Sequence, residues 1–169
     1  MGYLVAIGLS TGIVAAVFCH LVFVAQVVNV IVWAAFVGEA IFFAAGGKNQ
    51  GLFKGLASNF AGVFWAAVIF FISGNWKSPL SMGIAVFIAV VAMCVQAQWK
   101  VLSFIPGAFA GCASLFGSAS AEYPAGNLIG VLIALTLGAL MGWAAEKAAV
   151  WAYAKFISKP QSDAEKQSA

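Results

Sequence analysis

The chain has 169 residues, of which 64% are hydrophobic and 8% are charged, with a formal net charge of +3 and a mean hydropathy of +1.04. Soluble domains carry about 25% charged residues, so this composition could not cover a soluble fold without exposing large apolar patches. Glu39 is the one charged side chain before Lys48. The composition predicts a polytopic membrane protein of a single domain and leaves no room for a separate soluble catalytic module.

The remaining polar residues exclude several other classes of protein. All the basic residues are lysines at the ends of apolar runs, which is an anchoring pattern and not the continuous patch of a nucleic-acid-binding protein. Cys19, Cys94 and Cys112 lie inside apolar stretches without C-x-x-C spacing, which favours buried small side chains. With one histidine and no cysteine at ligand spacing, we expect neither a metal site nor another cofactor. Residues 1–21 also lack the basic residue that begins a cleavable signal peptide.

Apolar segments divide the chain into six predicted helices, since a spanning helix needs about 20 apolar residues. The stretch 2–45 is too long for one helix, and His20, Gln26 and Asn29 offer a break. The break is either a solvated outer turn, which is the simpler interpretation, or a deeper one whose backbone lines a cavity. The predicted helices cover residues 3–20, 28–46, 52–73, 80–96, 101–116 and 128–157. Gly, Asn, Ser and Pro predict loops at 46–51, 74–79 and 117–127. The predicted fold class is all-α: a compact bundle of about six transmembrane helices.

The distribution of lysines predicts the orientation of these helices. With the N-terminus in the cytoplasm, every lysine except Lys77 falls on the cytoplasmic side, as the positive-inside rule requires. Six crossings then place both termini in the cytoplasm and put Lys77 and Glu122 in outer loops. If the short fifth segment dipped into the membrane without crossing, the asymmetry would reverse. We predict a transmembrane domain over residues 1–157 and a polar, disordered cytoplasmic tail over residues 158–169.

Glycine spacing predicts close contacts between helices. G-x-x-x-G pairs occur at Gly8/Gly12, Gly47/Gly51, Gly51/Gly55, Gly107/Gly111, Gly126/Gly130 and Gly138/Gly142. This is more than the glycine content gives by chance, and the spacing allows two helix backbones to approach closely in a membrane. Helix packing is predicted at Gly8, Gly12, Gly107, Gly111, Gly138 and Gly142. Such packing serves contacts within a chain or between chains, so a homo-oligomer remains open.

Several stretches resemble a known family. The runs LSFIPGAFAG at 102–111, MCVQAQ at 93–98 and GLFKGLA at 51–57 are similar to the YcdZ family of small bacterial inner-membrane proteins, as are Thr11-Gly12-Ile13 and Trp65-Ala66. The likeness covers most of the chain to about residue 145, and S-F-I-P-G-x-F-x-G is its most specific part. The resemblance implies a multi-span protein of the bacterial inner membrane. That family is a domain of unknown function, so the resemblance implies no catalytic or binding residue. The family has a small or uncharged residue in place of Glu39, which argues against a mechanism at Glu39 that the whole family shares.

Glu39 is the only acid that we expect within the hydrocarbon, because the last predicted helix is long enough for its end with Glu146 to emerge. An ionised carboxylate in the membrane costs several kcal/mol, so such a residue usually faces a cavity or a partner. One interpretation is a proton or cation site. The other is a structural acid near the inner interface, since Lys48 follows soon after.

The fifth predicted helix is short and interrupted at Pro106-Gly107. Proline removes a backbone donor and frees a carbonyl, and transporters use such interruptions to direct backbone dipoles at a substrate. Ser103, Phe104 and Phe109 would then line the path. The alternative is a kink that fits Gly107 and Gly111 against a neighbouring helix.

Other polar residues fall near the ends of helices. Asn59 lies deep enough to need a partner, so an interhelical hydrogen bond is the default and a place on a solute path is the alternative. The same alternatives apply to Gln96 and Gln98. Tryptophans near the predicted boundaries, such as Trp76 and Trp99, are typical of an interfacial belt.

The function that the sequence favours is passage of a small solute. Because the spans carry so little charge, a channel or facilitative transporter for a neutral or weakly polar solute is favoured over an ion-coupled pump. Its partners would be the lipid bilayer and the small-molecule solute, with no nucleic acid. The alternative is a non-transporting accessory, assembly or sensor subunit. The chain has no H-E-x-x-H motif, no pair of intramembrane aspartates and no triad pattern, so we do not expect an enzyme.

Overall fold

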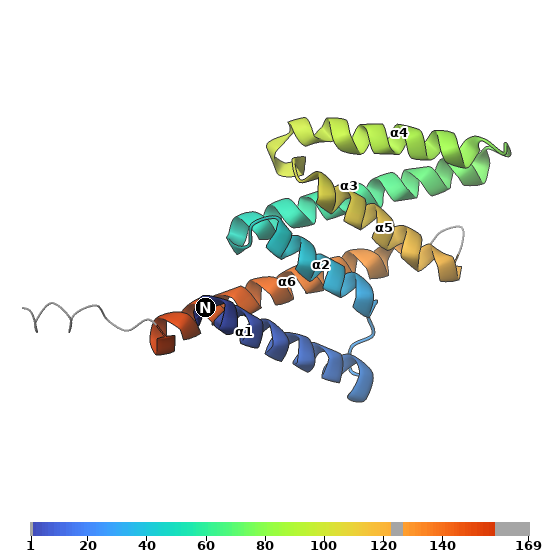
Figure 1. Ribbon diagram of the computed structural model, residues 1–169. Coiled ribbons are helices and arrows are strands. Elements are labelled where there is room, and N and C mark those ends of the chain that lie inside the picture. Colours follow the sequence, from blue (N-terminus) through green and yellow to red (C-terminus); the bar gives the residue numbers. More distant parts are fainter. Residues whose placement is uncertain (1, 123–126, 158–169) are drawn as a thin grey trace, which may run out of the picture.

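The computed structural model describes residues 2–122 and 127–157, and every regular element in these residues is a helix (Figure 1). The long helices are α1 (Gly2–Cys19), α2 (Val32–Ala44), α3 (Lys48–Asn75), α4 (Ser81–Val95), α5 (Ile105–Glu122) and α6 (Leu128–Ala152). Short π-helical turns extend α1 over His20–Val24 and α6 over Tyr153–Ile157, and two 3₁₀ turns, Gln96–Gln98 and Lys100–Leu102, join α4 to α5. The predicted all-α membrane protein of six helices is confirmed.

The six helices differ in length, and the difference matters for the membrane. Among the described residues four helical segments are long and apolar enough to cross a bilayer: Gly2–Val24, Lys48–Asn75, Ser81–Gln98 and Leu128–Lys155. The apolar helices Val32–Ala44 and Ile105–Ser118 are shorter. At 1.5 Å per residue, α2 is about 20 Å long, against about 30 Å of hydrocarbon. Helix α2 is therefore too short to cross on its own, whereas α5 has 18 residues in all but an apolar part that ends at Ser118.

Two predicted loops are shorter than expected. Gly46 and Gly47 adopt positive φ angles of 103° and 64°, which reverse the chain so tightly that α3 begins at Lys48. The predicted loop over 117–127 is wrong in its first part, because α5 continues to Glu122. The rest of that loop up to residue 126 and the predicted tail at 158–169 lie outside the described residues.

The interruption before α5 lies slightly earlier than predicted. The chain leaves α4 through the two 3₁₀ turns, and the Ser103 hydroxyl donates a 2.9 Å hydrogen bond to the Lys100 carbonyl. Helix α5 then starts at Ile105, so Pro106 lies in its first turn. A proline there lacks an amide that would have no partner within the helix in any case. The break is real, but Pro106 begins a helix and does not kink one.

The helices pack as two groups (Figure 1). In the α6 group, α1 and α2 pack mainly on α6, around a core of Phe18, Ala34, Ala35 and Ala134. In the α3 group, α4 and α5 pack mainly on α3, with Ile69, Ala85 and Ala89 in the core between α3 and α4. The two groups meet along α3 and α6 in a third cluster, made of Val63, Ala66, Phe70, Leu115, Val131 and Leu135. Consecutive helices are thus divided between groups, since α2 belongs to one and α3 to the other.

Candidate functional site

Helix α2 crosses α6 at a contact made by two glycines. A Cβ atom added at Gly38 would collide with the carbonyl oxygen of Leu135, and one added at Gly138 would collide with the carbonyl oxygen of Ala35. The two backbones therefore touch, which only glycine allows at these positions.

Helix α5 crosses α3 in the same manner. A Cβ atom at Gly111 would collide with the carbonyl oxygen of Asn59, and one at Gly62 would collide with that of Ala108. Each crossing is reciprocal, because each helix supplies one glycine and one carbonyl. These two crossings hold the short helices against the long ones.

Buried polar side chains lie beside both crossings. Glu39 of α2 is 5% exposed, and its Oε1 makes no hydrogen bond to the protein. Its Cγ would be 3.4 Å from a Cβ at Gly142, so the carboxylate side chain packs over α6. On α3, Ser58 and Asn59 are both fully buried, and the Ser58 hydroxyl and both amide atoms of Asn59 make no hydrogen bond to the protein.

Unpaired polar atoms in such surroundings are costly, typically by about 1–3 kcal/mol each in proteins. Each one therefore needs an explanation, and a role in contacting a polar ligand is one of the recognised explanations. The Ser58 and Asn59 groups can donate and accept hydrogen bonds, which suits a small uncharged molecule. Glu39 belongs to the other crossing, so the structure gives two polar positions and not one cluster.

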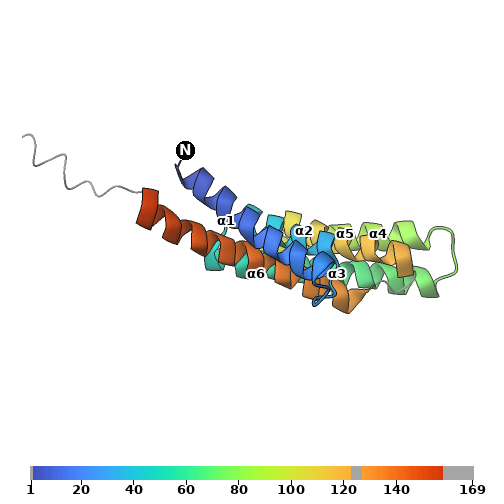
Figure 2. The same ribbon diagram turned by 90° about the horizontal axis from the view of Figure 1, so that it is seen from below.

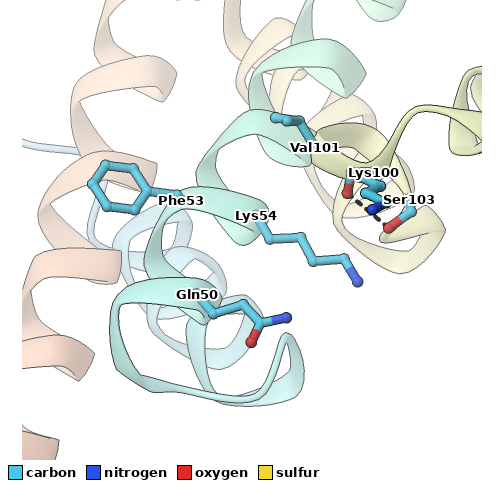
Figure 3. Close-up of a pocket in the computed structure, with 6 residues that line it drawn as sticks. All are labelled: Gln50, Phe53, Lys54, Lys100, Val101 and Ser103. Carbon is cyan, nitrogen blue, oxygen red and sulfur yellow. Dashed lines mark hydrogen bonds between the residues drawn. The ribbon is translucent and has the colours of Figure 1, made fainter.

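A pocket of about 340 Å³ opens at the end of the molecule where α3 begins (Figure 3). It is lined by Gln50, Phe53, Lys54, Lys100, Val101 and Ser103. Figure 3 shows Gln50 and Lys54 on α3 and Lys100 and Ser103 on the α4–α5 link. Ser58 follows Lys54 by one helical turn on the same face of α3. The pocket therefore lies one turn outside the buried Ser58 hydroxyl.

The predicted path residues separate into three environments. Asn59 lies at the α3–α5 crossing, where Gly107 packs closely: a Cβ there would be 2.8 Å from the Ser58 Cβ and 3.0 Å from a ring carbon of Phe104. Ser103 lines the surface pocket. Pro106 is exposed and Phe109 is 42% exposed, so the two residues face out of the molecule.

The predicted packing glycines also divide. Gly107, Gly111, Gly138 and Gly142 each have an atom of another helix within 3 Å of an added Cβ. Gly8 and Gly12 need a correction, because both are exposed on α1 and no described atom lies within 4 Å of an added Cβ. These two glycines do not pack helices of one chain together, since they face outward.

Three positions at the two crossings, Gly38, Gly62 and Ser58, could not be singled out from the sequence. Gly38 and Gly62 belong to no G-x-x-x-G pair; the usable signal for Gly38 was the pattern A-x-x-G, shared by Ala35–Gly38 and Ala108–Gly111. Ser58 looked like an ordinary helical serine beside Asn59. Gln96 is only partly satisfied: its Oε1 accepts a 2.9 Å hydrogen bond from the Trp65 indole, while its Nε2 has no partner.

A family model described as "Protein of unknown function (DUF1097)" matches residues 8–150. The chain belongs to this family. The inner membrane protein YcdZ of Escherichia coli strain K12 is 35% identical over 163 residues, covering 92% of this chain and 91% of that protein. YcdZ of Salmonella typhimurium strain LT2 is 34% identical over 159 residues, covering 89% and 90%.

The uncharacterized protein YahC of Escherichia coli is 34% identical over 113 residues, covering 57% of this chain and 66% of that protein. No solved structure matches the chain. Membership in DUF1097 and the named relatives make the chain an integral, multi-pass inner-membrane protein, as the resemblance implied.

Proposed function

We propose that this DUF1097 protein is a channel or facilitative transporter for a small neutral or weakly polar solute. The observation that carries the proposal is the pair of helices α2 and α5, each of which follows a link that is not α-helical. The links are residues 25–31, where Gln26 has a φ of 53°, and residues 96–104. Each link joins a full-length span to a helix whose apolar part is shorter than a full span.

We propose that the backbone of these links borders a water-filled path, for a physical reason. Lipid offers no partner for a free amide or carbonyl, so such backbone is found where protein covers it or where it lines a water-filled cavity. Transporters place substrate sites beside interrupted helices of this kind. The pocket at Lys54 and Lys100 lies beside one of these links, at the lysine-rich end.

The polar groups beside the crossings support the solute class. Ser58 and Asn59 offer neutral hydrogen-bonding groups, and Glu39 is the one acid in the central part of the described helices. An ion-coupled pump usually carries more intramembrane charge. A small molecule with hydroxyl or amide groups fits this site better than a multiply charged ion. We also infer that the protein moves its solute across the membrane without converting it chemically.

We assign both termini to the cytoplasm. Lys48 and Lys54 lie at the start of α3, Lys100 lies in the α4–α5 link and Lys155 lies at the end of α6, all toward one end of the molecule (Figure 1). Lys77 follows α3 at the opposite end. The positive-inside rule assigns the lysine-rich end to the cytoplasm.

One observation favours the alternative, a non-transporting accessory subunit. Only 6% of the α1 span is buried, and Leu4, Leu9 and Ile13 expose most of their surface along it. This face would suit a partner helix as well as lipid. The accessory function would leave the short helices and the unpaired polar atoms without a purpose.

Reconstitution into liposomes tests the proposal. Purified protein is reconstituted, and the uptake of small polyols, amides and weak acids is compared with that of protein-free liposomes. A carrier or channel should speed at least one solute, and the Asn59→Leu variant should reduce that rate while Ile133→Leu, an exposed position on α6, does not. Co-purification of a stoichiometric membrane protein together with an absence of uptake would favour the accessory function.

A further inference from the structure

The two glycine crossings correspond to each other residue by residue. Ala35 and Gly38 of α2 face α6 as Ala108 and Gly111 of α5 face α3. On the long helices, Leu135 and Gly138 of α6 correspond to Asn59 and Gly62 of α3. The spacing within every pair is the same. A single shift along the chain therefore superimposes α2 on α5, and another superimposes α3 on α6.

The sequences of the two short helices agree with this register. Aligning residues 33–45 (WAAFVGEAIFFAA) with residues 106–118 (PGAFAGCASLFGS) leaves no free choice of register, because the crossings fix it. Five positions are then identical: Ala35/Ala108, Phe36/Phe109, Gly38/Gly111, Ala40/Ala113 and Phe43/Phe116. The same register pairs Val32, where α2 begins, with Ile105, where α5 begins.

The arrangement in space agrees as well. A half-turn of Figure 1 in its own plane brings α1, α2 and α3 to the places of α4, α5 and α6, with every chain direction matched. Figure 2 shows that α2 and α5 lie on the same side of α3 and α6, as such a rotation requires. Because the rotation axis is perpendicular to the long spans, it lies in the plane of the membrane. The packing is equivalent too, since α1 packs on α6 as α4 packs on α3.

We propose that the chain is an inverted repeat of two three-helix units, and that the α6 group and the α3 group rock about the repeat axis to open a solute path between α3 and α6. This proposal rests on the transport function proposed above and places its path. Inverted repeats related by an axis in the membrane plane are a common basis for alternating access, in which one bundle rocks against the other.

The contact between the groups has the character of a closed constriction. Its centre is the apolar cluster that contains Val63 of α3, Leu115 of α5 and Leu135 of α6. Hydrogen bonds between the groups are found at both ends of the molecule. Apolar constrictions of this type close a path by excluding water, and they open when their walls separate.

The ends of the groups are held by specific bonds. At the cytoplasmic end, the Lys48 amide donates to Glu146 over 2.5 Å and the Trp143 indole donates to Asn49 over 2.9 Å. At the other end, the Asn127 amide donates to the Ser118 hydroxyl over 3.2 Å. A path that opens alternately would break one set while it keeps the other.

The repeat relates the helices and their crossing glycines, whereas the buried polar residues of one unit have no polar counterpart in the other. In the same register Glu39 corresponds to Cys112, and Asn59 corresponds to Leu135. The polar residues at both crossings, Ser58 included, thus have apolar counterparts. The rocking framework is symmetric, whereas the surface that a solute meets differs between the two sides of the membrane.

Cysteine labelling tests the proposal without any knowledge of the solute. In a variant with Cys19, Cys94 and Cys112 replaced by alanine, single cysteines are placed at buried positions, and membranes are treated with a small water-soluble methanethiosulfonate. Leu135→Cys and Val63→Cys report on the contact between the groups. The matched controls lie in the cores within the groups: Ala134→Cys, next to Leu135 and equally buried at 0% exposure, and Ile69→Cys, buried at 1% exposure like Val63.

The two positions between the groups should react at least about fivefold faster than their controls, because the rate follows the population of the opened state. A smaller difference, whether all four cysteines react or none does, would overturn the rocking of the groups. Circular dichroism and gel filtration confirm that each variant is folded before it is compared. If the cysteines between the groups react faster but liposomes show no uptake, the rocking motion is supported and the transport function is refuted. If liposomes show uptake but the cysteines react alike, the transport function is supported and the path between α3 and α6 is refuted.

Discussion

Glu146 of α6 accepts a 2.5 Å hydrogen bond from the backbone amide of Lys48, the first residue of α3. The carboxylate lies at the N-terminus of α3, where free amides and the helix dipole favour a negative charge. Gly47 is required beside it, because a Cβ there would lie 2.6 Å from the Glu146 Oε1. One acid thus caps the start of a helix in the other group and joins the two groups at the lysine-rich end.

Removing this cap should loosen the contact between the groups. We expect Glu146→Ala to lower the free energy of unfolding by about 1 kcal/mol, because the first turn of α3 loses an acceptor and a favourable charge. Trp143→Phe, which removes the bond to Asn49, should act in the same direction. Thermal unfolding in detergent measures both. Trp99→Phe is the control, since Trp99 is 68% exposed; equal melting temperatures for all three would contradict the cap.

A leucine side chain in place of a crossing glycine should destabilise the protein to a similar extent at either crossing. Gly38→Leu and Gly111→Leu each force a side chain into a backbone contact, and we expect each to cost about 2 kcal/mol or more. Gly74→Leu and Gly83→Leu meet open space and should be mild. Expression and thermal stability in detergent provide the comparison. If Gly38 alone were sensitive, the two crossings would not be equivalent.

Gly117 would not be a suitable control for these substitutions, although the sequence predicted that it lies in a loop. It lies inside α5, and a Cβ there would be 2.7 Å from a ring carbon of Trp33.

The unpaired Ser58 hydroxyl should lower the free energy of unfolding and contribute to solute uptake. Ser58→Ala removes a buried hydroxyl that has no partner, so we expect no loss of stability and a gain of up to about 1 kcal/mol. Ser114→Ala is the matched control, because the Ser114 hydroxyl donates a 2.8 Å bond to the Ala110 carbonyl. Melting temperatures should rise or stay constant for Ser58→Ala, together with slower solute uptake. Stability lost to the same extent in both variants would show that Ser58 is a structural residue.

The orientation predicts which loops react from which side. In the cysteine-free background, Ser78→Cys in the α3–α4 turn should react with an impermeant maleimide from outside intact cells. Ser103→Cys, in the pocket beside Lys54, should react only in inverted vesicles. One helix, α4, separates the two residues, so they should lie on opposite sides of the membrane. Labelling of both residues from outside would refute the six-helix crossing pattern.

The sequence predicted the fold well because hydropathy and lysine placement respond directly to the bilayer. It placed α3, α4 and α6 within a few residues. It missed the start of α2, since residues 27–31 are apolar apart from Asn29 but not helical, and hydropathy does not distinguish an apolar helix from an apolar link. It also ended the fifth helix too early, because a run rich in Ser, Gly and Ala looks like a loop although α5 continues to Glu122.

The candidate site was less predictable, because it depends on which helices cross. G-x-x-x-G found Gly111 and Gly138 but also Gly8 and Gly12, which touch nothing in the described chain. Only the folded chain shows that Gly38 and Gly62 complete the two crossings. Glu39 and Asn59 were noticed as polar residues in apolar segments, yet their placement at different crossings follows from tertiary packing alone.

Solute uptake by liposomes that hold the purified protein tests the central claim most directly. Stopped-flow light scattering would follow the swelling of liposomes in a panel of small polyols, amides and protonated weak acids. The account predicts that at least one of these solutes enters faster than into protein-free liposomes, and that Gly38→Leu and Gly111→Leu both abolish the difference. Uptake no faster than in protein-free liposomes for every solute of the panel, with protein that is folded and inserted, would contradict it.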